Sequence, residues 1–467
     1  MTGVMRSRSA RRVTGVDRFL TLIRVVMISV IIIGFLAFVA QQIDPDNPFA
    51  RWRNPGARGL TGDQFKGLLI SGLSQGSMYG LIALGYSMVY GVLGFINFAH
   101  GEVFMVGAMS GFITSDKLHA AGWWESNFLL SLTVVTLIAI VTSTFTAVVT
   151  ERIAYRPLRN SPRLIPLITS IGVSFFIQNA VMGLLGPATK SYPKLPDWLG
   201  NQRLLDFRDV VFWLPPLLIL LLWVIQLMGK VIALRLGLPG AGRPREKDVT
   251  TDGDGRFVAK LTKRLAAWFG ISAPALQRLV SVWISLSLAL SLVPKTIRTF
   301  QITGTKIMVV AVAAASMAGL WYLVERTKTG RAMRAVAEDK EIAALMGINV
   351  NRIIVVTFAV GGTMAGIGGI LWGLLFRSVN HMTGFLPGIK AFTAAVVGGI
   401  GNMGGAMAGG LFLGSAESVA PMVLMEPLGI PGVSQLKDAV AFTVLVLVLL
   451  FRPAGLFGER LSQEDRA

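Results

Sequence analysis

The sequence is poor in the residues on which most enzymatic chemistry depends. Its 467 residues include no cysteine and only three histidines, at positions 100, 119 and 381. Without cysteine, disulfide bonds, thiolate metal sites and cysteine nucleophiles are excluded. Three histidines leave little for a metal centre, so we expect no metal site. Charged residues make up only 15% of the chain, whereas soluble domains average about 25%.

Motifs for nucleotide hydrolysis and proteolysis are also missing. The nearest stretches to the phosphate-binding pattern G-x-x-x-x-G-K-[ST], "GPATKS" and "TGTK", lack its first glycine at the right spacing. Neither H-E-x-x-H nor G-x-S-x-G occurs. We therefore expect a protein that is not an enzyme, has no catalytic residue and binds no cofactor itself.

What the sequence does contain is a series of long apolar runs, and 53% of its residues are hydrophobic. About 20 apolar residues span a bilayer core of about 30 Å as a helix. We predict an all-α fold, a polytopic integral membrane helical bundle with about 10 to 12 transmembrane segments including short broken helices. The apolar segments are 19–40, 67–93, 101–115, 128–150, 164–186, 210–234, 279–294, 305–324, 353–376, 389–400, 404–420 and 439–451.

The net charge of +19 follows the expected topology. We interpret 19–40 as a retained helix and not a signal peptide, with the N-terminus inside. The loops that then fall inside, together with Lys230, hold 29 of the 44 Lys and Arg residues. Such an excess is typical of cytoplasmic loops, so both termini are expected inside. Because the topology explains the positive charge, no nucleic-acid partner is expected. Arg51, Arg53 and Arg58, which would lie outside, argue against this topology. The inside loops are 1–24, 151–163, 235–278, 325–352 and 452–467.

Two acidic residues interrupt the apolar segments. Glu102 follows Asn97 and His100 in the stretch "GFINFAHGE", and Glu417 lies in a late glycine-rich region. A carboxylate at the bilayer centre costs about 2.5 to 3.5 kcal/mol, so it usually has a function. The segments 101–115 and 389–400 are too short to span and are rich in glycine, a pattern that marks transport pathways. They could equally be half-helices that serve close packing alone.

Glycines also recur at a spacing of four residues. This spacing places them on one side of a helix and lets two backbones approach each other. It indicates close helix packing and says little about activity. The series are Gly72, Gly76 and Gly80, then Gly362 and Gly366, then Gly405 and Gly409, then Gly410 and Gly414.

The stretch "ERTKTGRAMRAVAEDKEIAALMGINVNRIIVV", residues 325–356, lies between two expected spans. Basic residues precede acidic ones by three to five positions, which predicts one polar helix. Gly347 would end it. Such a helix could dock on another protein, or the stretch could be an ordinary loop. The charged residues on which this prediction rests are Arg331, Arg334, Glu338, Asp339 and Glu341.

This stretch resembles the coupling loop of the permeases of branched-chain amino acid ABC importers. It fits the importer pattern E-A-A-x-x-x-G in part, with Glu341, Ala343 and Gly347 in place and Ile342 where the second residue is alanine. Four other stretches resemble the same family, and more specifically its LivH-type subunit. They are "GLSQGSMYGLIALGYSMVYGVLGFINFAHGEVFMVGA", "YRPLRNSPRLIPLITSIGVSFFIQN", "FLPGIKAFTAAVVGGIGNMGGAMAGGLFLGSAES" and "LLFRPAGLFG".

The resemblance implies a subunit that moves branched-chain or related small amino acids, amides or urea inward across a bacterial inner membrane. It implies a second related permease, two cytoplasmic ATPases, which use the ATP, and a periplasmic binding protein as partners, besides membrane lipid. The residues that would couple to the ATPases are Arg331, Arg334, Glu338, Asp339, Glu341, Ala343 and Gly347. Those expected near the substrate pathway are Asn97, His100, Glu102, Asn402 and Glu417; His100 and Glu102 could instead cap broken helices or hydrogen-bond across the bundle.

The chain departs from the family in two places, and these set the expected domain boundaries. Residues 1–66 add a basic tail, an extra helix and a linker, and 187–304 add two spans and a basic cytoplasmic loop. The loop could carry an amphipathic helix on the inner leaflet or be a solvated loop. The permease core is expected at 67–186 and 305–458, with the coupling loop at 325–352, and 459–467 form a cytoplasmic tail.

Two other functions remain open at this stage. In an ion- or proton-coupled secondary transporter or a channel, His100 and Glu102 would carry ions or protons. In a membrane scaffold without transport, changes at Arg331 or Gly347 would leave uptake intact.

Overall fold

The structure is a computed structural model, and it describes residues 15–43, 60–159, 161–162, 164–206, 299–428, 430 and 432–458. The chain divides into two compact units, Met1–Asn201 with Thr303–Ala467, and Gln202–Ile302. In the described part of the second unit, strand β2 (Gln202–Asp206) pairs with β3 (Thr299–Thr303). The two extra spans expected at 210–234 and 279–294, and the basic loop between them, lie outside the described residues.

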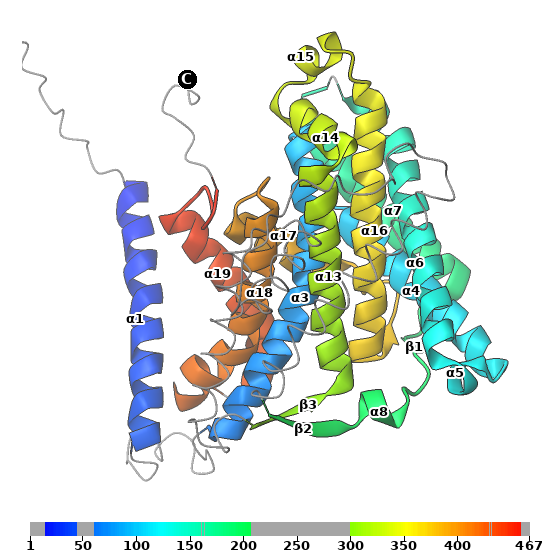
Figure 1. The fold of residues 1–467 in the computed structure, drawn as a ribbon. Coiled ribbons are helices and arrows are strands. Elements are labelled where there is room, and N and C mark those ends of the chain that lie inside the picture. Colours follow the sequence, from blue (N-terminus) through cyan, green and yellow to red (C-terminus); the bar gives the residue numbers. More distant parts are fainter. Residues whose placement is uncertain are drawn as a thin grey trace, which may run out of the picture. The chain divides into compact units, whose positions relative to one another are not determined.

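The first unit is a bundle of helices (Figure 1). A single short antiparallel pair is described in it, in which Lys190 of β1 (Lys190–Ser191) faces Val379 of β4 (Ser378–Val379). The long helices are α1 (Gly15–Ile43), α3 (Gly62–Leu93), α4 (His100–Ala120), α6 (Phe128–Thr150), α7 (Leu164–Leu185), α13 (Gly304–Arg326), α16 (Val350–Phe376), α17 (Phe385–Gly398), α18 (Met403–Ala420) and α19 (Lys437–Phe451). The shorter helices are α5 (Trp123–Ser126), α8 (Asp197–Gly200), α14 (Lys328–Glu338), α15 (Lys340–Leu345), η1 (Glu151–Tyr155), η2 (Arg156–Leu158), η3 (Pro421–Met425), η4 (Glu426–Leu428) and η5 (Val433–Leu436).

Within the described ranges, seven helices are long and apolar enough to cross a membrane. The all-α class and the multi-pass membrane bundle expected from the sequence are therefore confirmed. The candidate spans are Thr21–Ala40, Gly62–Leu93, Phe128–Leu158, Leu164–Leu185, Gly304–Arg326, Val350–Phe376 and Met403–Leu428.

One of the two short segments is longer than predicted. Helix α4 has 21 residues, or about 31 Å, because it continues past the charged Asp116 and Lys117, which are exposed near its end. The sequence prediction stopped at Ser115, where the apolar run stops, and was wrong about the length. Helix α17 has 14 residues, or about 21 Å, and is as short as expected.

Side chains close the helix ends at several boundaries. Thr61 and Gln64 form a reciprocal capping box at the start of α3, which satisfies two amide groups that have no partner within the helix. Gly94 ends α3 with a φ of 78°, a left-handed conformation that glycine adopts readily. Asn349 caps α16 through the amide of Arg352.

Close backbone packing of α3 on α18 forms the centre of the bundle. A Cβ atom added at Gly414 would lie 2.3 Å from both the N and the Cα atoms of Gly76, and one at Gly410 would lie 2.4 Å from the N of Gly80. Only glycine permits this approach, as the four-residue spacing predicted. The series Gly362 and Gly366 lets α16 approach α6 in the same way, with Thr144 and Ala139 as neighbours.

The glycine contact yields a test of the fold. We expect Gly414→Ala to lower the free energy of unfolding by about 1 to 3 kcal/mol, because the added methyl group forces the two backbones apart. Gly319→Ala in α13 is the matched control, since a Cβ there meets no atom within 4 Å. Thermal unfolding in detergent measures the stability of both purified variants. Equal stabilities of Gly414→Ala and Gly319→Ala would contradict this packing.

Candidate functional site

The stretch "GFINFAHGE" forms the turn between α3 and α4 and the start of α4, and its polar side chains are buried. Asn97, His100 and Glu102 expose 3%, 2% and 1% of their surface, so the turn is not a surface loop. The Tyr155 hydroxyl in η1 donates a 2.5 Å hydrogen bond to Asn97 Oδ1. The amide of Phe98 donates to Ser170 Oγ on α7 at 3.2 Å. Hydrogen bonds thus connect the turn to η1 and to α7.

His100 is the first residue of α4 and packs on α3. Its ring meets the Tyr86 ring edge-on, with 5.0 Å between centroids and 71° between planes. Gly85 makes room for it, since a Cβ atom there would lie 2.1 Å from His100 Nε2. Among the described residues this nitrogen has no hydrogen-bond partner. His100 therefore fills a tight interface and keeps one unused polar atom.

Two side chains of α7 donate hydrogen bonds to Glu102, both to the same carboxylate oxygen. Oε1 accepts hydrogen bonds from Gln178 Nε2 at 2.7 Å and from Ser174 Oγ at 3.2 Å. Oε2 has no partner among the described residues. The residue borders a cavity of about 260 Å³ whose other walls include the aromatic rings of Tyr86 and Phe98.

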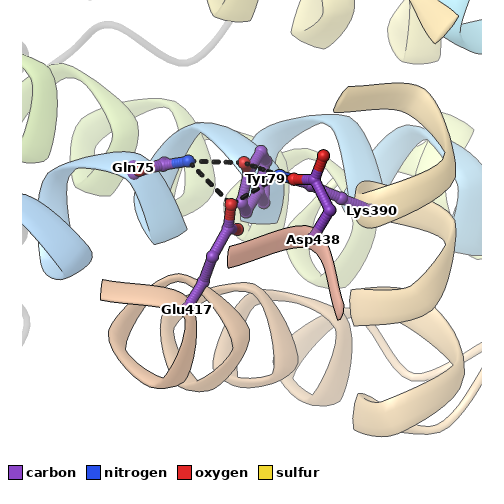
Figure 2. A network of polar contacts seen from close by, with 5 residues as sticks. All are labelled: Gln75, Tyr79, Lys390, Glu417 and Asp438. Carbon is purple, nitrogen blue, oxygen red and sulfur yellow. Dashed lines mark hydrogen bonds and ion pairs between the residues drawn. The ribbon is translucent and has the colours of Figure 1, made fainter. Parts of the chain in front are cut away.

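Glu417 belongs to a second polar cluster, which Figure 2 shows. Lys390 Nζ on α17 lies 2.5 Å from Glu417 Oε1 and 2.6 Å from Asp438 Oδ1. It also donates to the Tyr79 hydroxyl at 3.4 Å. Gln75 Nε2 donates to Tyr79 at 2.6 Å and to Glu417 Oε1 at 3.5 Å. We call these five residues the Lys390 cluster.

The Lys390 cluster joins four helices, because its members come from α3, α17, α18 and α19. The side chains of Lys390 and Glu417 are only 8% and 2% exposed, whereas that of Asp438 is 46% exposed. A buried charge is costly unless it is paired, so Lys390 and Glu417 depend on each other. In the described part of the chain, no three His, Asp or Glu side chains gather in a way that could hold a metal ion.

The predicted coupling stretch forms two helices instead of one. Asp339 interrupts it: its Oδ1 accepts hydrogen bonds from the amides of Glu341 and Ile342 at 2.8 and 2.9 Å and so caps α15. Arg334 pairs with Glu325, which precedes α14. The single helix expected across the basic and acidic residues is therefore wrong, because an aspartate at this position favours a helix start. Gly347 ends the stretch as predicted, with a φ of 82°.

One face of this helix pair is held against the bundle. Met333 and Val336 of α14 and Ala343 of α15 are buried. The ammonium of Lys340 donates to the carbonyl of Leu93, at the end of α3. Arg331, Glu338 and Glu341 are exposed on the other side. The pair is thus anchored to the bundle and presents charged side chains outward.

Apolar side chains also project outward from α15. Ile342 is 59% exposed, Leu345 86% and Met346 77%. These three residues, which we call the α15 tip, lie between α13 and α16 in the chain, at the end of the bundle where those two helices are joined (Figure 1). Clustered apolar residues at such a position are typical of a protein contact.

Asn402 lies apart from the other predicted pathway residues. Its Oδ1 accepts from the amide of Gly405, which caps α18, and its Nδ2 donates to the carbonyl of Phe457. It borders a cavity of about 500 Å³ together with Met333 and Arg334 of α14. The five predicted residues therefore lie in three places. Asn97, His100 and Glu102 lie at the α3–α4 turn, Glu417 belongs to the Lys390 cluster, and Asn402 lies near α14.

Sequence reasoning missed most of the Lys390 cluster. Lys390 was detectable as a lone cation in the apolar segment 389–400, whereas Tyr79 and Gln75 gave no signal. Glu151, expected in an inside loop, is fully buried and paired with Arg159, which also donates to Asn351. The Lys390–Glu417 and Arg159–Asn351 pairs join residues 27 and 192 positions apart, so spacing alone does not reveal them. Glu151 and Arg159 are eight positions apart.

Comparison with known proteins identifies the family. Residues 68–236 and 254–449 match the family described as branched-chain amino acid transport system, permease component. No solved structure matches the chain significantly. The match covers both parts of the expected permease core and extends into the segment between them.

Individual relatives agree with this match. The chain is 37% identical over 390 residues to the high-affinity branched-chain amino acid transport system permease protein BraD of Pseudomonas aeruginosa, covering 84% of this chain and 94% of that protein. It is 34% identical, with the same coverage, to the permease protein LivH of the corresponding system of Escherichia coli K12. A short region of 88 residues, 18% of this chain and 24% of the relative, is 39% identical to the fructose import permease protein FrcC of Rhizobium meliloti.

These relatives are transport permeases, and their names agree with the resemblance found in the sequence motifs. The extent of the match and the identity over most of both chains show that this multi-pass membrane protein belongs to the branched-chain amino acid transport system permease family.

Proposed function

We propose that the chain is the transmembrane permease subunit of an ATP-binding cassette importer. It moves branched-chain or related small amino acids from the periplasm to the cytoplasm across a bacterial inner membrane. The names of its relatives support the substrate class. Amides and urea remain candidate substrates, as the sequence resemblance suggested.

The observation that carries this proposal is the form of the α14–α15 pair. It presents the exposed α15 tip, while Met333 and Val336 on its other side pack into the bundle. A partner that binds the tip can therefore move α13, α16 and the end of α3, which Lys340 contacts. An importer permease that lacks its own phosphate-binding motif needs such a connection.

The proposed partners follow from this role. Two cytoplasmic ATPase subunits bind the coupling residues, a second related permease completes the pathway, and a periplasmic binding protein delivers the substrate. The joined end of α13 and α16 is then cytoplasmic, as are both termini. Asn97, His100, Glu102, Asn402 and Glu417 stay proposed pathway residues, with the turn at Asn97 shaping the pathway.

A proton-coupled secondary transporter is the alternative that one observation favours. Glu102 Oε2 and Glu417 Oε2 are both buried and have no hydrogen-bond partner among the described residues. A buried carboxylate oxygen of this kind is suited to take up a proton. The two functions differ in their energy source.

The energy source is measured by uptake of labelled leucine into cells that express the complete system. We expect uptake to stop when ATP is depleted while the proton gradient is kept, because the ATPases supply the energy. A protonophore added with ATP held constant should leave most uptake intact. The opposite pattern would contradict the importer and favour proton coupling.

The α15 tip gives a second test. We expect Leu345→Glu to lower co-purification of the ATPase subunits and ATP-driven leucine uptake by about tenfold or more, because a charge would be buried in an apolar contact. Since Leu345 is 86% exposed in this chain, the stability of the isolated permease should not change. Leu345→Met, which keeps the contact apolar, is the matched control. Full assembly and uptake by Leu345→Glu would refute this docking site.

A further inference from the structure

A cavity of about 420 Å³ lies beside the Lys390 cluster. Its wall includes Phe376, the last residue of α16. Helix α16 has 27 residues, or about 40 Å, and begins next to α15. The cavity is therefore at the end of the bundle remote from the coupling helices. Its volume falls in the range of small-molecule sites, about 300 to 1,000 Å³.

The cavity wall combines cations with apolar surface. Among the described residues, Lys390 and Lys437 border it, and no Asp or Glu does. Glu417 and Asp438 pair with Lys390 but are not among the residues that line the cavity. Trp372 and Phe376 supply adjacent aromatic surface. The wall thus favours a ligand that has one anionic and one apolar part.

Tyr79 adds a hydrogen-bond donor to the same wall. Its oxygen accepts hydrogen bonds from Gln75 and Lys390, and among the described residues its own hydroxyl hydrogen has no acceptor. The contact with Lys390 is long, at 3.4 Å, so it is the weakest of the three that the ammonium makes. A carboxylate placed here can accept from the hydroxyl and from Lys390 together.

We propose that this cavity is a binding site for the carboxylate of an apolar amino acid. Lys390 and Tyr79 bind the carboxylate, Lys437 adds a second positive charge, and Trp372 and Phe376 contact the side chain. The inference rests on the proposed function, because it places a substrate site inside the permease. It adds that the permease itself selects for a carboxylate, which disfavours the amides and urea named above as substrates, so that an amide of the same amino acid is bound poorly.

The absence of cysteine makes the cavity directly measurable. Met382 borders it and is 55% exposed, so Met382→Cys gives the full chain a single reactive thiol. The rate at which this thiol reacts with an anionic methanethiosulfonate reagent is compared with its rate with a cationic one. We expect Lys390→Met to shift the ratio of these rates toward the cationic reagent by about tenfold. Lys306→Met is the control, since that lysine is bound to Ser71 outside the cavity.

Protection by ligand tests selectivity in the same Met382→Cys chain. Leucine in excess should slow labelling, while leucinamide at the same concentration should not. Protection should be lost in the double variant Lys390→Met with Glu417→Gln. The second change avoids leaving Glu417 buried without its cation. Protection should be kept in Lys306→Met. An unchanged reagent ratio, equal protection by leucine and leucinamide, or no protection by leucine would each overturn the proposal.

ATP-driven uptake separates this inference from the proposed function. If the wild-type complex takes up leucine with ATP and the labelling results fail, the carboxylate site is wrong and the importer stands. If uptake by the wild type does not depend on ATP, the proposed function fails, and the labelling still decides whether the cavity binds a carboxylate.

Discussion

Pairing of buried charges is the constraint on which the rest of this structure depends. Lys390 lies between Glu417 and Asp438, and neither Lys390 nor Glu417, which are both buried, could remain charged there alone. Because the partners come from different helices, satisfying them fixes how α17, α18 and α19 meet α3. The glycine contact between α3 and α18 sets the distance at which this pairing is possible. Packing and polar pairing therefore specify the same arrangement.

The α3–α4 turn meets the same constraint through hydrogen bonds instead of an ion pair. Asn97 and Glu102 obtain their partners from Tyr155, Ser174 and Gln178, which lie in η1 and α7. Polar side chains that break an apolar run thus form connections between elements. One oxygen each of Glu102 and Glu417 is among the buried polar atoms that have no hydrogen-bond partner in the described part of the chain.

The sequence allowed the fold class and the described membrane spans to be predicted, because each has a local signal. Apolar length predicts a span, four-residue glycine spacing predicts close packing, and Gly347 predicts a helix end. Lengths were missed where local and tertiary effects compete, as in α4, which continues through Asp116 and Lys117. The division of α14 from α15 was missed because Asp339 was taken as a charge and not as a cap. Lys390 was missed because its partners are distant in the sequence.

The central claim is that the α14–α15 pair at one end controls a substrate site at the other, about 40 Å away along α16. The reaction rate of Met382→Cys with an impermeant thiol reagent, measured in the assembled complex with and without a non-hydrolysable ATP analogue, tests it most directly. Binding of the analogue is expected to change the rate severalfold, and Leu345→Glu to abolish the change. The same rate in both states of the wild-type complex would contradict the account.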